Sequence, residues 1–201
     1  MREPLDSFTL DLKGPKVTSA GVDGIRAKVT QTAGEVTITP SAPIRPVGRD
    51  VIVTIEWKGV PDQTEFPGWG MPVGWQGDDE DGWFTMSEPD GTSTWVPSND
   101  HPSDKATWRV ALDVPAGVAG ISNGRLEGDG PVTKDGRSVW TWSEDEPMAS
   151  YLVLAAVGDY ELVTSERDGI RSTFAFPTSP AEDARAGFDH HDAILDFFAD
   201  R

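Results

Sequence analysis

The chain has 201 residues and carries 34 acidic side chains against 17 Lys and Arg, which gives a formal net charge of −17. Because nucleic acids and anionic lipids need a basic partner surface, this charge excludes nucleic-acid binding and predicts no membrane docking. The sequence contains no cysteine, so disulfides, thiol catalysis and thiolate metal ligands are excluded. At ~100–200 residues per domain, the length suits one large domain or a domain with an attached piece.

Short β-strands are predicted along most of the chain, because apolar and polar side chains alternate. Phe8, Leu10 and Leu12 share one face of the first strand, which ends at Gly14 and Pro15. Further strands are predicted at residues 36–39, 51–57, 108–114, 139–142, 151–157, 160–163 and 170–176. Roughly nine or ten short strands without intervening helices are typical of a mainly β fold, either β-sandwich-like or an open barrel.

Two segments near the end of this series give sharper predictions. Residues 151–157 form a nearly continuous apolar run, which is typical of a strand buried on both faces. Asp168 and Gly169 lie between two alternating runs, and this dipeptide favours a tight hairpin turn. We therefore expect residues 160–163 and 170–176 to pair as a hairpin.

One helix is predicted, from about Pro180 to the end of the chain. Ser179 and Glu182 form a capping box, and Pro180 occupies the first helical position. Apolar side chains then recur at helical spacing on one stripe, which contains Ala184, Phe188, His191, Leu195 and Phe198.

The segment between residues 59 and 83 is irregular and rich in aromatic side chains. It holds Phe66, Trp69, Trp75 and Trp83 among glycines, prolines and acids. A connection of this length is usually either functional or loosely ordered. Exposed tryptophans here would suit a stacking platform for a sugar or a peptide, whereas packed ones would form a small satellite core.

The histidines do not predict a zinc site. His190 and His191 are adjacent in the predicted helix, where neighbouring side chains point ~100° apart and cannot reach one ion. His101 lies in a turn of sequence NDHP, where a local hydrogen bond explains it. No H-E-x-x-H motif, phosphate-binding glycine loop or nucleophile elbow is present, so we assign no catalytic or metal-binding residue.

Glu88 is the carboxylate that the local pattern singles out. It follows a short apolar strand and precedes a Pro-Asp-Gly turn, which places its side chain at a strand end beside a loop. The residue types alone leave two interpretations open: a binding carboxylate, or an exposed loop acid without a function.

Four sequence blocks in one order resemble a known family. The blocks are residues 83–91 (WFTMSEPDG), 95–108 (WVPSNDHPSDKATW), 121–124 (ISNG) and 146–160 (EPMASYLVLAAVGDY). Together they resemble the N-terminal domain of the aminopeptidase N family of zinc metallopeptidases. The chain departs from the family pattern at Ser98, where the family has Cys, and at His101, where it has Glu.

The resemblance implies a saddle-shaped, multi-sheet β domain at residues 1–178. Residues 179–201 would be the first helix of the thermolysin-like catalytic domain that follows in the family. That domain would supply the zinc, so we expect no cofactor in this chain and no activity of the chain alone. The N-terminus shows no apolar signal core, which favours the cytoplasm, but secretion stays open because family members usually have strands before Leu5.

The resemblance also implies a role for Glu88. In the family this position contributes Gln or Glu to recognition of the substrate's α-amine, with Met86 and Ser87 as neighbours on the substrate side. The expected partners are the following catalytic domain, whose active site this domain would cap, and the N-terminus of peptide substrates. The alternative is a stand-alone β-sandwich binding module that uses Trp69, Trp75 and Trp83 for sugar or peptide.

Overall fold

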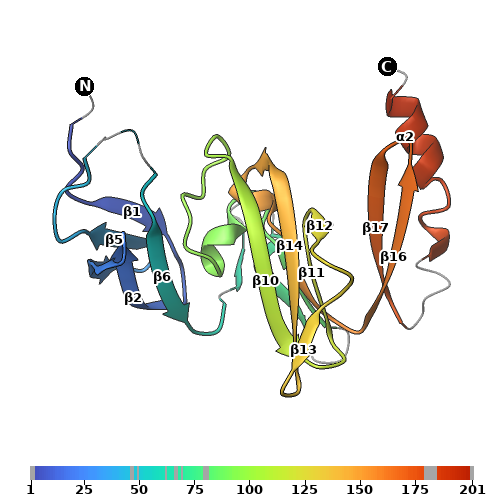
Figure 1. The fold of residues 1–201 in the computed structure, drawn as a ribbon, viewed down its shortest axis with the longest axis horizontal. Helices are drawn as coiled ribbons and strands as arrows, with labels where there is room; N and C mark the ends of the chain where they lie inside the picture. Colours follow the sequence, from blue (N-terminus) through green and yellow to red (C-terminus); the bar gives the residue numbers. More distant parts are fainter. Residues whose placement is uncertain are drawn as a thin grey trace. The chain divides into compact units, whose positions relative to one another are not determined.

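The computed structural model describes residues 3–45, 48, 50–61, 63–65, 68, 70–78, 82–178 and 185–199. Over these residues the fold is mainly β, with several sheets and one C-terminal α-helix, α2 (Figure 1). This confirms the predicted fold class. None of the helices in the described ranges is long and apolar enough to cross a membrane.

Among the described residues, nine strands precede the first 3-10 helix. They are β1 (Phe8–Asp11), β2 (Lys16–Val22), β3 (Ile25–Arg26), β4 (Lys28–Gln31), β5 (Glu35–Thr39), β6 (Val53–Lys58), β7 (Gln63–Glu65), β8 (Pro72–Asp78) and β9 (Gly82–Met86). The elements that follow are η1 (Gly91–Thr94), β10 (Ala106–Pro115), β11 (Ala119–Ser122), β12 (Arg125–Leu126), β13 (Val132–Lys134), β14 (Arg137–Met148), η2 (Ser150–Leu152), β15 (Ala155–Gly158), β16 (Tyr160–Arg167), β17 (Ile170–Pro177) and α2 (His191–Ala199).

The strands form five sheets in the described part of the chain. Two are three-stranded, with the orders β1-β5-β4 and β3-β2-β6. The others have the orders β10-β14-β12 with β13 also on β14, β11-β15-β9-β8-β7, and β16-β17.

The chain divides into two compact units. The first contains Met1–Gln76, Phe84–Trp108 and Glu144–Leu154, and the second contains Gly77–Trp83, Arg109–Ser143 and Ala155–Arg201. Each unit has its own apolar core. The first is built on Leu12, Val36 and Ile38, which are fully buried, and the second on Trp142 with Ala119, Ile121 and Ala156.

The predicted hairpin is confirmed. β16 and β17 pair antiparallel in continuous register from Tyr160↔Pro177 to Arg167↔Ile170. Asp168 and Gly169 have φ angles of 51° and 80°, the left-handed region that a tight hairpin turn requires.

The prediction of one strand over residues 151–157 is wrong in its first half. Ser150–Leu152 form the 3-10 helix η2, and strand β15 starts only at Ala155. The turn is closed by two short-range bonds, from Leu152 N to Ala149 O (3.1 Å) and from Val153 N to Ser150 O (3.0 Å). Side chains distant in sequence also hold Ser150, which hydrophobic periodicity cannot reveal.

The predicted C-terminal helix is interrupted within the described residues, because residues 185–186 are helical and a turn follows them. α2 begins at His191, residues 187–190 form a turn, and the capping box at Ser179–Glu182 lies outside the described residues. α2 lies beside the β16-β17 hairpin (Figure 1), where Phe174 contacts the rings of Phe188 (5.4 Å between centroids) and His191 (4.8 Å). Leu195 of the predicted stripe is half-buried, but Phe198 stays 69% exposed.

Candidate functional site

The candidate site lies where strand β9 ends. Met86, its last residue, is half-buried, Ser87 is buried, and the side chain of Glu88 is exposed. The Glu88–Pro89 peptide bond is cis. The chain then reverses, because Gly91 N donates a hydrogen bond of 2.6 Å to Ser87 O.

The residue after this turn must be small. A Cβ at Gly91 would lie 3.0 Å from Gly74 N, 3.2 Å from Met86 O and 3.2 Å from Val73 Cβ. At these distances a side chain would force its neighbours to move, and two of the three neighbours are backbone atoms. Gly91 also opens η1, whose four residues are all buried. The turn that carries Glu88 is therefore packed tightly against its own unit.

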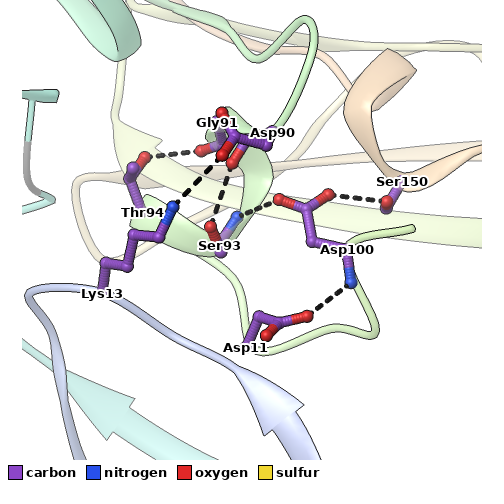
Figure 2. A network of polar contacts seen from close by, with 8 residues as sticks. All are labelled: Asp11, Lys13, Asp90, Gly91, Ser93, Thr94, Asp100 and Ser150. Carbon is purple, nitrogen blue, oxygen red and sulfur yellow. Dashed lines mark hydrogen bonds and ion pairs between the residues drawn. The ribbon is translucent and has the colours of Figure 1, made fainter. Parts of the chain in front are cut away.

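A network of polar contacts surrounds η1 (Figure 2). The carboxylate of Asp100 accepts from Ser93 N (3.0 Å) and from Ser150 Oγ (2.7 Å), while Asp100 N donates to Asp11 Oδ2 (2.9 Å). Thr92 Oγ1 donates to Ser150 O (2.8 Å). These bonds connect β1, η1 and η2, all of which belong to the first unit.

Further bonds of the network reach the turn itself. Ser93 Oγ donates to Asp90 O (3.0 Å), Thr94 Oγ1 donates to Gly91 O (2.6 Å), and Lys13 Nζ lies 3.4 Å from Asp90 Oδ2 (Figure 2). The carboxylates of Asp11, Asp90 and Asp100 are thus occupied by donors of this chain. Glu88, by contrast, takes up no donor within the described residues, so its carboxylate is available to a ligand.

The sequence-predicted residues Met86, Ser87 and Glu88 are placed consecutively at this strand end. Ser87 differs from Glu88 in facing inward, because it is only 5% exposed and its Oγ accepts from Trp95 Nε1 at 3.4 Å. Among Met86, Ser87 and Glu88, the carboxylate of Glu88 is the polar side-chain group that is exposed to solvent.

Sequence reasoning did not single out Asp100, Ser93 or Ser150. Asp100 and Ser150 both lie in blocks that carry the family resemblance, so their position in these blocks is the signal that could have found them. Their mutual contact could not be foreseen, because 50 residues separate them.

Of the tryptophans in the alternative interpretation, Trp75 is the one that the structure describes in the first unit, and it is not an exposed stacking surface. Trp75 is half-buried and packs edge to face on Trp95, with 6.0 Å between ring centroids. Trp83 is 36% exposed, and Trp69 lies outside the described residues.

A zinc site does not fit the described residues. They contain no group of three or more His, Asp or Glu side chains that could hold a metal ion. His101 Nδ1 lies 2.8 Å from Ser103 Oγ, and His191 Nε2 lies 2.9 Å from Ser172 Oγ, so each ring has a local partner.

The fold and this site define a multi-sheet β domain that presents an exposed carboxylate on a tightly packed turn. The chain belongs to the Peptidase M1 N-terminal domain family, whose profile matches residues 5–152. The family resemblance of the four sequence blocks is thereby confirmed.

Curated relatives are longer enzymes. Aminopeptidase N of Haemonchus contortus is 33% identical over 92 residues, which are 43% of this chain and 9% of that protein. Leucyl aminopeptidase of Saccharolobus solfataricus is 23% identical over 172 residues, which are 83% of this chain and 20% of that protein. The chain therefore spans a fifth or less of these relatives.

Solved structures extend the likeness over nearly the whole chain. A mutant M1 zinc metallopeptidase from Deinococcus radiodurans, bound to a Tyr-Ser-Ala substrate, is 30% identical with a TM-score of 0.80, over 92% of this chain and 44% of that one. A two-domain M1 zinc metallopeptidase mutant bound to L-arginine is 31% identical with a TM-score of 0.78 over the same shares. Aminopeptidase A of Legionella pneumophila shares the fold at 16% identity, with a TM-score of 0.70 over 90% of this chain and 21% of that one.

Proposed function

We propose that this chain acts as the non-catalytic N-terminal domain of a zinc aminopeptidase and binds the substrate's α-ammonium group through Glu88. The exposed, unoccupied carboxylate of Glu88 on its tightly packed turn carries the proposal. Membership of the M1 N-terminal domain family supports the enzyme class. The peptide and amino acid bound by its structural relatives support a substrate of the same kind.

The chemistry of Glu88 suits a terminal amine. An ammonium group is a compact cation with three hydrogen-bond donors, and a carboxylate offers two acceptor oxygens of opposite charge. The turn supplies orientation, because Ser87 is buried before Glu88 and Gly91 is wedged against backbone after it. A ligand with a free N-terminus would meet a carboxylate held near one position.

The same proposal covers the partners. This domain would cap the active site of a catalytic domain that follows it in the same polypeptide, and the N-terminus of a peptide would lie against Glu88. A bound zinc ion supplies polarisation of the scissile carbonyl in such enzymes. Since the described residues do not fit a zinc site, this chain's own contribution is to bind and orient the substrate.

The test is Glu88→Ala in the complete aminopeptidase. Breaking a desolvated, charged hydrogen bond costs about 2–5 kcal/mol, so kcat/KM for an aminoacyl substrate should fall roughly 30-fold or more. The inhibition constant of a free amino acid should rise similarly, because it carries the α-ammonium group. Inhibition by the corresponding carboxylic acid without the amine should not change.

Glu146→Ala is the matched control, because Glu146 is also an exposed glutamate beside a proline in the first unit. It should leave both constants within about twofold of the parent enzyme. Equal, small losses in the two variants would make Glu88 an ordinary loop acid and remove the proposed anchor.

A further inference from the structure

Asp100 is the centre of the network in Figure 2. Its two carboxylate oxygens accept different donors, Ser93 N on Oδ2 and Ser150 Oγ on Oδ1. Its backbone N–H is held by Asp11, 89 residues away in sequence. The half-buried side chain of Asp100 thus connects η1 with Ser150, and its backbone adds the distant Asp11 to the same network.

The network leads from Asp100 to the turn that carries Glu88. Ser93, whose N–H donates to Asp100, bonds through its hydroxyl to Asp90 O. Gly91, two residues before Ser93, donates to Ser87 O. Asp90 and Ser87 flank the Glu88–Pro89 pair on its two sides. The backbone on both sides of Glu88 is therefore held by bonds that depend on η1 staying in place.

A polar side chain matters at this position because Ser93 N and Ser150 Oγ both need a hydrogen-bond partner. An alanine would leave the buried Ser93 N–H without a partner, which costs about 1–3 kcal/mol locally. An asparagine could still accept from Ser93 N with its carbonyl oxygen. Its NH2 group could then donate to Ser150 Oγ, because a hydroxyl can rotate and accept. Asparagine should therefore preserve the geometry much better than alanine.

We propose that Asp100 is a positioning residue for substrate binding: it fixes η1 and thereby aims the carboxylate of Glu88 at the α-ammonium group. The inference rests on the proposed function of Glu88 and adds the residue that holds the Glu88 turn in place. Asp100 itself does not touch the substrate in this mechanism. Its effect on activity passes entirely through Glu88.

The experiment is a double-mutant cycle in the complete aminopeptidase. Asp100→Ala should lower kcat/KM roughly tenfold, mainly through KM, because a displaced anchor binds the amine poorly. In the Glu88→Ala background, Asp100→Ala should change kcat/KM by less than about twofold, because the group it positions is gone. Asp100→Asn should recover activity to within about threefold of the parent.

Asp104→Ala is the control in the same loop, since Asp104 also accepts a side-chain bond, from Asn99 Nδ2 (2.8 Å), but lies outside the network. It should leave KM within about twofold. If Asp100→Ala does not fold, Ser150→Ala replaces it in the cycle, because it removes one of the two donors and leaves the acceptor in place.

The outcomes separate the two proposals. Suppose that Glu88→Ala lowers kcat/KM and that Asp100→Ala lowers kcat/KM by the same factor whether or not Glu88 is present. The positioning role would then be overturned, and the anchor role of Glu88 would stand. An Asp100→Asn variant as impaired as Asp100→Ala would also overturn it. A silent Glu88→Ala would remove the anchor and the positioning role together.

Discussion

The hydroxyl of Ser98 destabilises the fold, although the backbone of the same residue stabilises it. Its backbone pairs with Asp11 in both directions, at 2.7 and 3.2 Å. Its Oγ is buried and has no hydrogen-bond partner among the described residues. An unsatisfied buried hydroxyl costs about 1–3 kcal/mol, so the side chain opposes the folding that its backbone supports.

Ser98→Ala should therefore stabilise the chain. We expect the free energy of unfolding to rise by about 1 kcal/mol and Tm by about 2–4 °C, measured by thermal denaturation. Ser150→Ala is the control, because Ser150 is a buried serine whose hydroxyl, unlike that of Ser98, has a partner: it donates to Asp100. It should lower Tm. A Ser98→Ala variant destabilised as much as Ser150→Ala would show that the hydroxyl has a partner after all.

At the scale of secondary-structure elements, the sequence predicted those set by local patterns. It did not predict those that depend on contacts between residues distant in sequence. The β16-β17 hairpin was predictable because Asp168 and Gly169 supply the positive φ angles locally. Strand β2 was missed because Ser19, Ala20 and Gly21 give no apolar alternation. The 3-10 helix η2 was missed because Thr92 and Asp100, distant in sequence, hold Ser150. Glu88 was predicted as a site residue from its strand-end position and from the family resemblance, while the packing of its turn required the structure.

Glu127 connects strands of one sheet through its carboxylate. Arg109 of β10 binds it with two bonds of 2.8 Å, and Ser143 of β14 donates to the same carboxylate. These hydrogen bonds, that of Arg109 first, lower the pKa of Glu127 from 4.5 to about 2. Because the folded pKa lies below the unfolded one, the ionised form favours the fold. Its contribution is present above about pH 4.5 and is lost as the pH falls towards 2.

The difference in Tm between the parent chain and Glu127→Gln should depend on pH in the same range. We expect the parent to have the higher Tm at pH 6, and the difference to shrink progressively between pH 4.5 and 2.5 in thermal denaturation. The effect should be small, since both side chains are partly exposed and solvent screens them. Arg109→Gln should reproduce most of the trend. A difference that stays constant from pH 6 to 2.5 would contradict this account.

At the scale of the whole molecule, this chain spans only part of the length of its relatives. It covers 44% of the two-domain relative and a fifth or less of the curated enzymes. Its charge of −17 suits a partner surface that is cationic, such as the ammonium terminus of a peptide, better than an anionic one. Under the proposed function, hydrolysis is the task of the catalytic domain that accompanies this domain, and the described residues contribute substrate binding.

The 201-residue chain alone should therefore show no aminopeptidase turnover, with or without added zinc. Hydrolysis by a zinc enzyme needs a held metal ion that polarises the carbonyl and lowers the pKa of its water. The described residues offer no group of three ligands for it, and His101 and His191 already bond to serines. The measurement is release of a chromogenic group from an aminoacyl substrate, with the complete enzyme at equal molar concentration as the positive control. Zinc-dependent hydrolysis that stays with the purified chain through several columns would contradict the prediction, because a metal centre would then have to assemble within these residues.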